Sequence, residues 1–190
     1  MDALALLTAD HNRVRGLFAR FKSAQKAEDT AQLTQLGQQI FRELVVHTAI
    51  EEERFYPWAA ALSDEIKELI DEGIQEHHVV KVLMEEVGQL TPDQPEWLAK
   101  LTVLIENVDH HAEEEETALF PKIRSATDAD SRKQLGAQLD QDKGAKGAPM
   151  LADTIDLTTA ELKTLATQQE IPGRSTMDHD ELAATVAPTS

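Results

Sequence analysis

The sequence predicts an all-α protein, in which an antiparallel, up-and-down four-helix bundle is followed by a small C-terminal helical module. Two observations support this prediction. Over residues 1–124, apolar side chains recur at steps of three and four while glycine is sparse, a pattern typical of amphipathic helices. Short connections rich in turn-forming residues divide this stretch into four segments, and short connections favour antiparallel neighbours.

Each of the four helices has a boundary signal in the sequence. They are predicted at about residues 8–26, 30–55, 63–90 and 96–119. Pro57 is expected to end the second helix, and Pro121 follows the fourth. Ser63 opens the third as an N-cap, and the segment Thr91–Pro92–Asp93–Gln94–Pro95 breaks it.

The sequence changes character after the bundle, which is assigned to residues 1–124. Residues 125–152 are read as a short polar helix near 129–139 and a flexible linker around 141–149. Residues 153–190 form the small helical module. Its expected features are a helix capped by Thr158 or Thr159 that contains Leu162 and Leu165, a turn at Ile171–Pro172–Gly173–Arg174, and a capping box of Ser175 and Asp178.

The composition excludes several classes of function. With 35 acidic and 18 basic residues the net charge is −17, which opposes binding to nucleic acid or to anionic membranes. The chain has no cysteine, so disulfides, thiolate catalysis and iron–sulfur clusters are excluded. The first ten residues lack the basic region of a signal peptide and no apolar run is long enough to span a membrane, so we expect a soluble, cytoplasmic protein.

The first two helices repeat as the third and fourth, with histidines in register. Asp10–His11 aligns with Glu76–His77. His47 aligns with His111, and the following positions then pair Glu51 with Glu115, Tyr56 with Phe120 and Pro57 with Pro121. Two matches in the same order are hard to obtain by chance, so the histidines are the informative feature of the sequence.

The spacing of these residues predicts a metal centre inside the bundle. A step of four returns to nearly the same helix face, so His47 lies beside Glu51 and His111 beside Glu115. His11 and His77 are in phase with apolar residues and should also point inward. Buried carboxylates are costly without compensation, and a bound cation is the simplest compensation. The predicted ligands are His11, His47, Glu51, His77, His111 and Glu115.

The donor set favours two iron ions over other metals. A tetrahedral zinc would leave two donors unused, and magnesium or calcium would prefer oxygen throughout. Mixed imidazole and carboxylate donors suit two irons bridged by the carboxylates and by an oxo or hydroxo group. About two of the twelve coordination positions would stay open for water, dioxygen, peroxide or nitric oxide. The ferritin-like alternative needs a Glu-x-x-His step, and no acidic residue here precedes a histidine by three.

The order His11, His47 with Glu51, His77, and His111 with Glu115 resembles the hemerythrin-like cation-binding family over roughly residues 5–122. The resemblance implies a non-haem di-iron centre that meets oxygen or related molecules. Oxygen-carrying members have a further histidine four residues from the first one on the third helix, where this chain has Gly73 or Lys81. We therefore expect reaction with peroxide, in a catalase-like manner, or with related oxygen and nitric oxide species. The alternative is a non-enzymatic sensor of oxygen, nitric oxide or iron.

Residues near the predicted ligands have more ordinary explanations. His78 and His110 differ in direction from their neighbours by about 100° and are expected at the surface or behind the ligands. The adjacent glutamates, Glu52, Glu53, Glu113, Glu114 and Glu116, are read mainly as a solvated acidic face, from which some members could orient a ligand imidazole. Tyr56 is expected to pack, unless the helix distorts before Pro57 and turns its side chain inward.

The C-terminal module resembles the N-terminal domain of transcription terminator Rho and SAP-like folds. The resemblance rests on Thr159–Ala160–Glu161–Leu162–Lys163, on Ile171–Pro172–Gly173–Arg174–Ser175 and on Asp180–Glu181–Leu182. Some such modules bind nucleic acid. This segment, however, contains only two basic residues, Lys163 and Arg174, and seven acidic ones, which opposes contact with phosphates. A protein partner is the favoured interpretation of the module.

Overall fold

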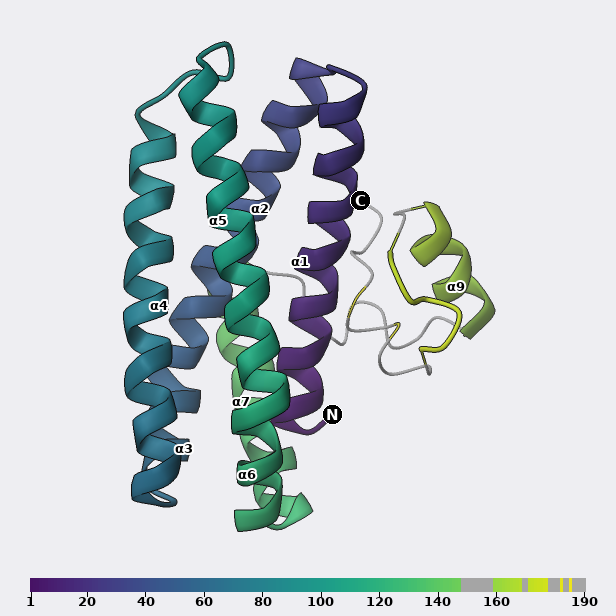
Figure 1. Ribbon diagram of the computed structural model, residues 1–190. Helices are drawn as coiled ribbons and strands as arrows, with labels where there is room; N and C mark the ends of the chain where they lie inside the picture. The colour runs from purple at the N-terminus through teal and green to yellow at the C-terminus, as the bar shows by residue number, and fades with distance from the viewer. Residues whose placement is uncertain (148–158, 169–170, 178–181, 183–184, 186–190) are drawn as a thin grey trace.

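The computed structural model describes residues 1–147, 159–168, 171–177, 182 and 185, and the part of the chain it describes contains helices and no strand. Four long helices form the predicted antiparallel bundle (Figure 1): α1 (Ala3–Lys26), α2 (Thr30–Ile50), α4 (Asp64–Gly88) and α5 (Pro95–Glu114). Within these described ranges, no helix combines the length and the apolar character needed to cross a bilayer.

Side-chain caps fix where three of these helices begin. The carboxylate of Asp2 accepts a 3.0 Å hydrogen bond from the Ala5 amide, so α1 begins at Ala3, five residues before its predicted start. Asp29 caps α2 in the same way, and Ser63 caps α4 as predicted. Caps of this kind satisfy amides that have no partner within the helix.

The helices continue beyond the positions where proline was expected to end them. After Ile50 the chain forms a π-helical turn, η1 (Glu51–Phe55), and then α3 (Tyr56–Ala60), which contains Pro57. The same arrangement follows α5, as η2 (Glu115–Leu119) and α6 (Phe120–Ala126), which contains Pro121. The wider π turn bonds each amide five residues back, which relieves the clash between a proline ring and the preceding turn. The prediction that the helix ends at Pro57 is therefore wrong.

A further helix, α7 (Ala129–Ala145), lies against the bundle beside α1 and α2. It covers the predicted polar helix at 129–139 and also residues 141–145, which were expected to begin a linker. Gly136 allows its close approach, because a Cβ there would lie 2.5 Å from the Met1 carbonyl oxygen and 2.8 Å from the Ala3 nitrogen. Residues 148–149, also assigned to the linker, lie outside the described residues.

The C-terminal segment contains α9 (Thr159–Gln168), with Leu162 buried, and a turn over residues 172–176, as expected. Its buried residues Leu162, Ala166, Ile171, Met177 and Leu182 form a small cluster of their own. Asp178, the second half of the expected capping box, lies outside the described residues. The division of the chain into three units and the resemblance of this module to Rho and SAP folds stay predictions.

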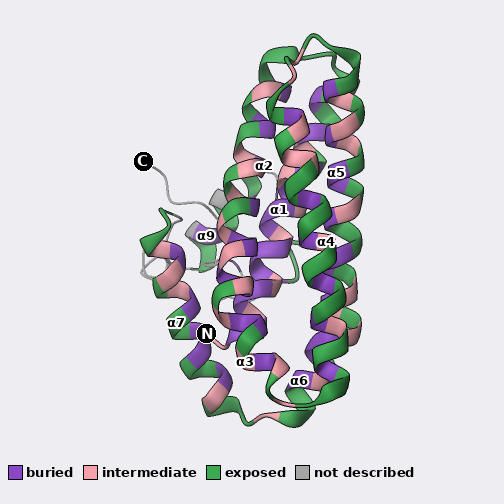
Figure 2. Cartoon of the chain, turned by 90° about the vertical axis from the view of Figure 1, so that its left-hand side faces the viewer, coloured by how far each residue is buried: buried purple, intermediate pink, exposed green. Residues whose placement is uncertain are grey.

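The apolar core is divided into two clusters along the bundle axis, and the polar site lies between them. One cluster includes Leu7, Ile50, Ile70 and Leu119. The other includes Val14, Leu44, Val80 and Val108. On α1, α2 and α4 a predicted histidine ligand lies between a residue of the first cluster and a residue of the second, and His111 lies between Val108 on α5 and Leu119 on η2. Figure 2 shows the buried residues along the inner faces of these helices.

Candidate metal centre

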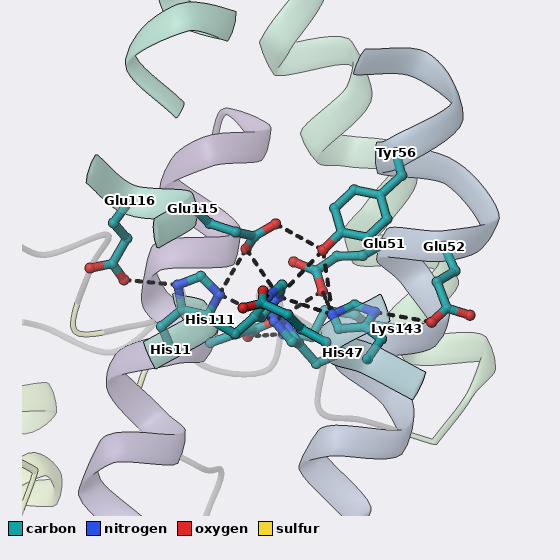
Figure 3. A network of polar contacts seen from close by, with 12 residues as sticks. His11, His47, Glu51, Glu52, Tyr56, His111, Glu115, Glu116 and Lys143 are labelled. Atoms are coloured by element: carbon teal, nitrogen blue, oxygen red, sulfur yellow. Dashed lines mark hydrogen bonds and ion pairs between the residues drawn. The ribbon is translucent and has the colours of Figure 1, made fainter. Parts of the chain in front are cut away.

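The six predicted ligands come together in the middle of the bundle, where all are at least 94% buried. They form two overlapping groups within metal-binding distance: His11, His47, Glu51 and Glu115, and Glu51, His77 and His111. Figure 3 shows the imidazoles of His11, His47 and His111 and the two carboxylates pointing toward one another. Glu51 belongs to both groups, as expected for a carboxylate between two metal positions.

The imidazoles are arranged in two pairs. Nε2 of His11 lies 3.2 Å from Nε2 of His47, and Nε2 of His77 lies 3.0 Å from Nε2 of His111. Two nitrogens bound at right angles to one ion, each at about 2.1 Å, would be about 3.0 Å apart. The two pairs therefore match two neighbouring ions.

Each carboxylate lies between the two pairs. Glu51 Oε2 is 3.2 Å from His47 Nε2 and 3.4 Å from His77 Nε2. Glu115 Oε2 is 3.3 Å from His11 Nε2 and 4.0 Å from His111 Nε2. Both oxygens of Glu51 and Oε2 of Glu115 are buried without a hydrogen bond. A cation supplies the compensation that these oxygens lack, so the donor set fits a metal centre.

Carboxylates behind the imidazoles orient the nitrogens toward the centre. Nδ1 of His11 donates to Glu116 at 2.8 Å, Nδ1 of His77 donates to Glu52 at 3.0 Å, and Nδ1 of His111 donates to Glu76 at 2.6 Å. Nδ1 of His47 faces Asp10 Oδ2 at 3.6 Å, which is an electrostatic contact and not a hydrogen bond. A proton held on Nδ1 leaves the lone pair of Nε2 free to bind a metal.

The sequence analysis predicted that some of the neighbouring glutamates could orient a ligand imidazole, but it did not say which ones. Glu52 and Glu116 are not simply part of a solvated acidic face, whereas Glu53 pairs with Lys146 at the surface. The signal was present in the repeat, because Glu52 and Glu116 each follow a predicted ligand glutamate by one position. Asp10 and Glu76 each precede a predicted ligand histidine by one position.

The pKa values of the two carboxylates in the centre are shifted in opposite directions. Burial and repulsion from Glu115 raise the pKa of Glu51 well above its ordinary value. Burial also acts to raise the pKa of Glu115, but hydrogen bonding to His11 and the nearby imidazoles outweigh it and lower that pKa to about 2. Burial acts to lower the pKa of His11, but hydrogen bonds to Glu115 and Glu116 raise it to about 9. Burial and the neighbouring imidazoles lower the pKa of His77 to about 3.

Tyr56 belongs to the site, so the less favoured of its two predicted orientations, the inward one, is the one observed. Its hydroxyl donates to Glu115 Oε1 at 3.0 Å and lies 3.4 Å from His77 Nε2 and 3.3 Å from His111 Nε2. The π turn η1 accommodates an extra residue and so shifts later side chains by roughly 100° from their place on a regular helix. Burial, with Glu115 and Glu51 nearby, raises the Tyr56 pKa well above its ordinary value, so the hydroxyl keeps its proton.

Two small cavities adjoin the centre. One, of about 20 Å³, is walled by apolar side chains such as Val14, Leu44 and Val108 beneath the imidazoles. The other, of about 50 Å³, is lined by Tyr56, Gly73, Glu76, His111 and Glu115 among others. A Cβ at Gly73 would lie 3.3 Å from His111 Cε1 and 3.3 Å from the Tyr56 hydroxyl, so this glycine keeps the second cavity open. His78 and His110 are exposed, as expected.

The fold and the site define a helical-bundle protein with a cation-binding centre of histidines and glutamates. The chain belongs to the hemerythrin family, because the model of the Hemerythrin HHE cation-binding domain matches residues 2–123. Membership in this family supports the binding of metal at the clustered histidines and glutamates.

Two curated relatives are similar to this chain. A DNA nickase from Nostoc sp. (strain PCC 7120 / SAG 25.82 / UTEX 2576) is 29% identical over 136 residues, which are 70% of this chain and 37% of the relative. An uncharacterized hemerythrin-like protein from Schizosaccharomyces pombe (strain 972 / ATCC 24843) is 30% identical over 113 residues, 59% of this chain and 54% of the relative. The chain thus spans between about a third and a half of their lengths. No solved structure matches it significantly.

Proposed function

We propose that the protein is a non-haem di-iron protein that disproportionates hydrogen peroxide to water and dioxygen. The observation that carries this proposal is the pair of overlapping donor groups that share Glu51, with a small cavity beside His111. His11 and His47 would hold one iron, and His77 and His111 would hold the other, with Glu51 and Glu115 between them. Two bound irons would supply the two-electron oxidation and reduction that this reaction requires.

The residues around the irons have separate tasks. The outer carboxylates Glu116, Glu52 and Glu76 hold three imidazoles in one orientation. The Tyr56 hydroxyl, which donates to Glu115, keeps a proton at the rim of the cavity. Gly73 keeps open the neighbouring cavity of about 50 Å³, which is larger than the roughly 10–15 Å³ that one water needs.

Oxygen release from added peroxide tests the proposal. Iron-loaded protein should release one dioxygen for every two peroxides, over many turnovers per chain, measured with an oxygen electrode. Gln in place of Glu51, which removes a charge between the two iron positions, should abolish the release. Release that stops after about one turnover per iron would contradict catalytic disproportionation.

A sensor of oxygen, nitric oxide or iron is the second candidate. The observation that favours it is the contact between the C-terminal segment and α1, the helix that carries His11. A Cβ at Gly16 would lie 3.3 Å from Pro172 Cδ. A change at the metal centre could reach the C-terminal segment through this helix. A sensor would change its susceptibility to proteolysis with iron or nitric oxide, without turnover of peroxide.

The name of the Nostoc relative raises DNA as a third possibility. The net charge of −17 opposes contact with phosphates, so we do not extend that activity to this chain. Nicking of supercoiled plasmid by the iron-loaded protein, in a salt-dependent manner, would reverse this conclusion.

A further inference from the structure

Helix α7 packs against α1, α2 and η1, which carry ligands of the metal centre, although α7 lies outside residues 2–123, the part of the chain that matches the family model. Its last turn and the C-cap residue Lys146 carry three ion pairs with the bundle. Asp142 pairs with Arg54, Lys143 pairs with Asp10, and Lys146 pairs with Glu53 at 2.9 Å. The first and third pairs are partly exposed, whereas the second is buried.

Lys143 reaches from α7 to the outer side of the metal centre. Its side chain is 6% exposed and that of Asp10 is 4% exposed, and the two form a charge-assisted hydrogen bond. The other oxygen of Asp10 faces Nδ1 of His47 at 3.6 Å. Figure 3 draws Lys143 in the same network of polar contacts as His47 and the other converging ligands. A buried ammonium requires a partner of opposite charge, so α7 can dock here only with Asp10 in place.

The ion pairs of the outer carboxylates follow the internal repeat, except for the pair that Lys143 makes. Glu52 pairs with Lys81, and Glu116 pairs with Arg15, and these two cations each follow a ligand histidine by four residues. Asp10 and Glu76 are the other equivalent pair, each preceding a ligand histidine.

The equivalent residues Asp10 and Glu76 break the symmetry of the repeat. Asp10 has Lys143, whereas the described residues place no lysine or arginine in an ion pair with Glu76, whose neighbours are His110 and Glu114. The two halves of the centre therefore differ in the charge behind one imidazole.

We propose that Lys143 is a positioning residue of the metal centre, which fixes the ligand His47 through Asp10 and makes the two metal positions unequal. The inference rests on the proposed di-iron function. Without the ammonium, the buried carboxylate of Asp10 loses its ion-pair partner and turns toward water. It then no longer faces the His47 ring, and the metal position of His11 and His47 weakens while that of His77 and His111 is unaffected.

The test measures iron release from the full-length protein to a ferrous chelator. Lys143→Met keeps the length of the side chain and removes its charge, Lys143→Arg keeps the charge, and Lys146→Met removes the neighbouring surface pair as a control. We expect Lys143→Met to release about one of two irons at least about tenfold faster, the loss typical of partners behind metal ligands. Lys143→Arg and Lys146→Met should stay within about twofold of the unmodified protein.

The absorption spectrum separates positioning from simple support of the fold. The near-ultraviolet charge-transfer bands should shift in Lys143→Met and not in Lys146→Met. If Lys143→Met unfolds, the double variant with Asp10→Asn removes both buried charges and keeps an oxygen for His47 Nδ1. That variant should fold, and because it lacks the carboxylate behind His47 it should release about one of its two irons at least about tenfold faster than the unmodified protein.

Three results would overturn the inference. One is unchanged release and spectrum in folded Lys143→Met, and a second is an equal effect of Lys143→Met and Lys146→Met. The third is equal acceleration for both irons, in Lys143→Met or in the double variant. If the unmodified protein carries no iron, the proposed function fails together with this inference. If it carries iron but Lys143→Met behaves normally, only the inference fails.

Discussion

The hydroxyl of Tyr56 lies 3.0 Å from Glu115 Oε1, although these residues come from opposite halves of the internal repeat. The equivalent of Tyr56 is Phe120, whose ring stacks on His11 with 6.1 Å between ring centroids. One half of the centre therefore has a hydrogen-bond donor where the other half has only an apolar ring.

Tyr56→Phe should keep the fold and the iron but slow the reaction. It removes a hydrogen bond to a buried carboxylate, a loss of about 1.5–3 kcal/mol, while the ring continues to pack. We expect turnover of peroxide to fall by about tenfold or more, measured as oxygen release at saturating iron. An unchanged rate together with an unchanged spectrum would remove Tyr56 from the site.

Gly73→Val should close the larger cavity. Its Cβ would contact both His111 and the Tyr56 hydroxyl at 3.3 Å, and the two methyl groups would fill the remaining space. Binding of azide to the iron-loaded protein, followed by absorption, and release of oxygen from peroxide should both slow by at least about tenfold. Gly88→Ala is the control in the same helix, because no atom lies within 4 Å of a Cβ there. If azide binding and oxygen release are equally fast in Gly73→Val and in the unmodified protein, small molecules do not reach the metal centre through this cavity.

Glu52→Gln should weaken iron binding, because Glu52 accepts the 3.0 Å hydrogen bond from Nδ1 of His77. Loss of such an outer partner typically costs about 10- to 100-fold in metal affinity. Glu53→Gln changes the next residue, which pairs with Lys146 at the surface, and should leave the affinity unchanged. Competition with a chelator of known affinity measures both variants. Equal affinities would show that the outer carboxylates do not support the ligands.

The stability of the metal-free protein should fall as the pH rises from about 6.5 to 9. Although burial opposes it, hydrogen bonding to Glu115 and Glu116 raises the pKa of His11 from 6.5 to about 9. A histidine whose pKa is higher in the folded state than in the unfolded state stabilises the fold fully at a pH below its unfolded-state pKa. This stabilisation is lost as the pH rises through its folded-state pKa. The loss is at most about 3 kcal/mol by the usual conversion of a pKa shift.

Urea unfolding of the metal-free protein at several pH values between 6.5 and 9 measures this slope. His77, whose pKa is lowered from 6.5 to about 3, makes stability rise with pH mainly below pH 6.5, so its contribution within this window is small and of opposite sign. In the variant His11→Gln the free energy of unfolding should fall less over this pH range, because the contribution of His11 is absent. A stability that rises with pH over this range would contradict the protonated His11 of the metal-free state.

The sequence predicted the helical bundle and its inward-facing donors because both depend on local periodicity. A step of four residues places His47 beside Glu51 wherever the helix lies, and the repeat selects His77 and His111 over His78 and His110. The π turns were not predictable in the same way, because they depend on how the proline-containing segments pack. As a result, the continuation of the helix past Pro57 was missed, and the inward direction of Tyr56 was predicted only as the less favoured alternative.

The contact between Lys143 and Asp10 could not be predicted for a different reason. The two residues lie 133 positions apart, and no periodicity relates α7 to the bundle. Lys143 stands beside Gly144 and Gly147 in a stretch with the composition of a linker. Only the docking of α7, which requires the close approach at Gly136, gives this lysine a buried partner.

The iron content of the purified protein and its histidine variants gives the sharpest test of the proposed di-iron centre. We expect about two irons per chain, a loss of iron in His77→Ala and in His111→Ala, and full iron content in His78→Ala and in His110→Ala, whose histidines are exposed. Full iron content in His77→Ala or His111→Ala, or equal losses in the neighbouring variants, would contradict the proposed centre.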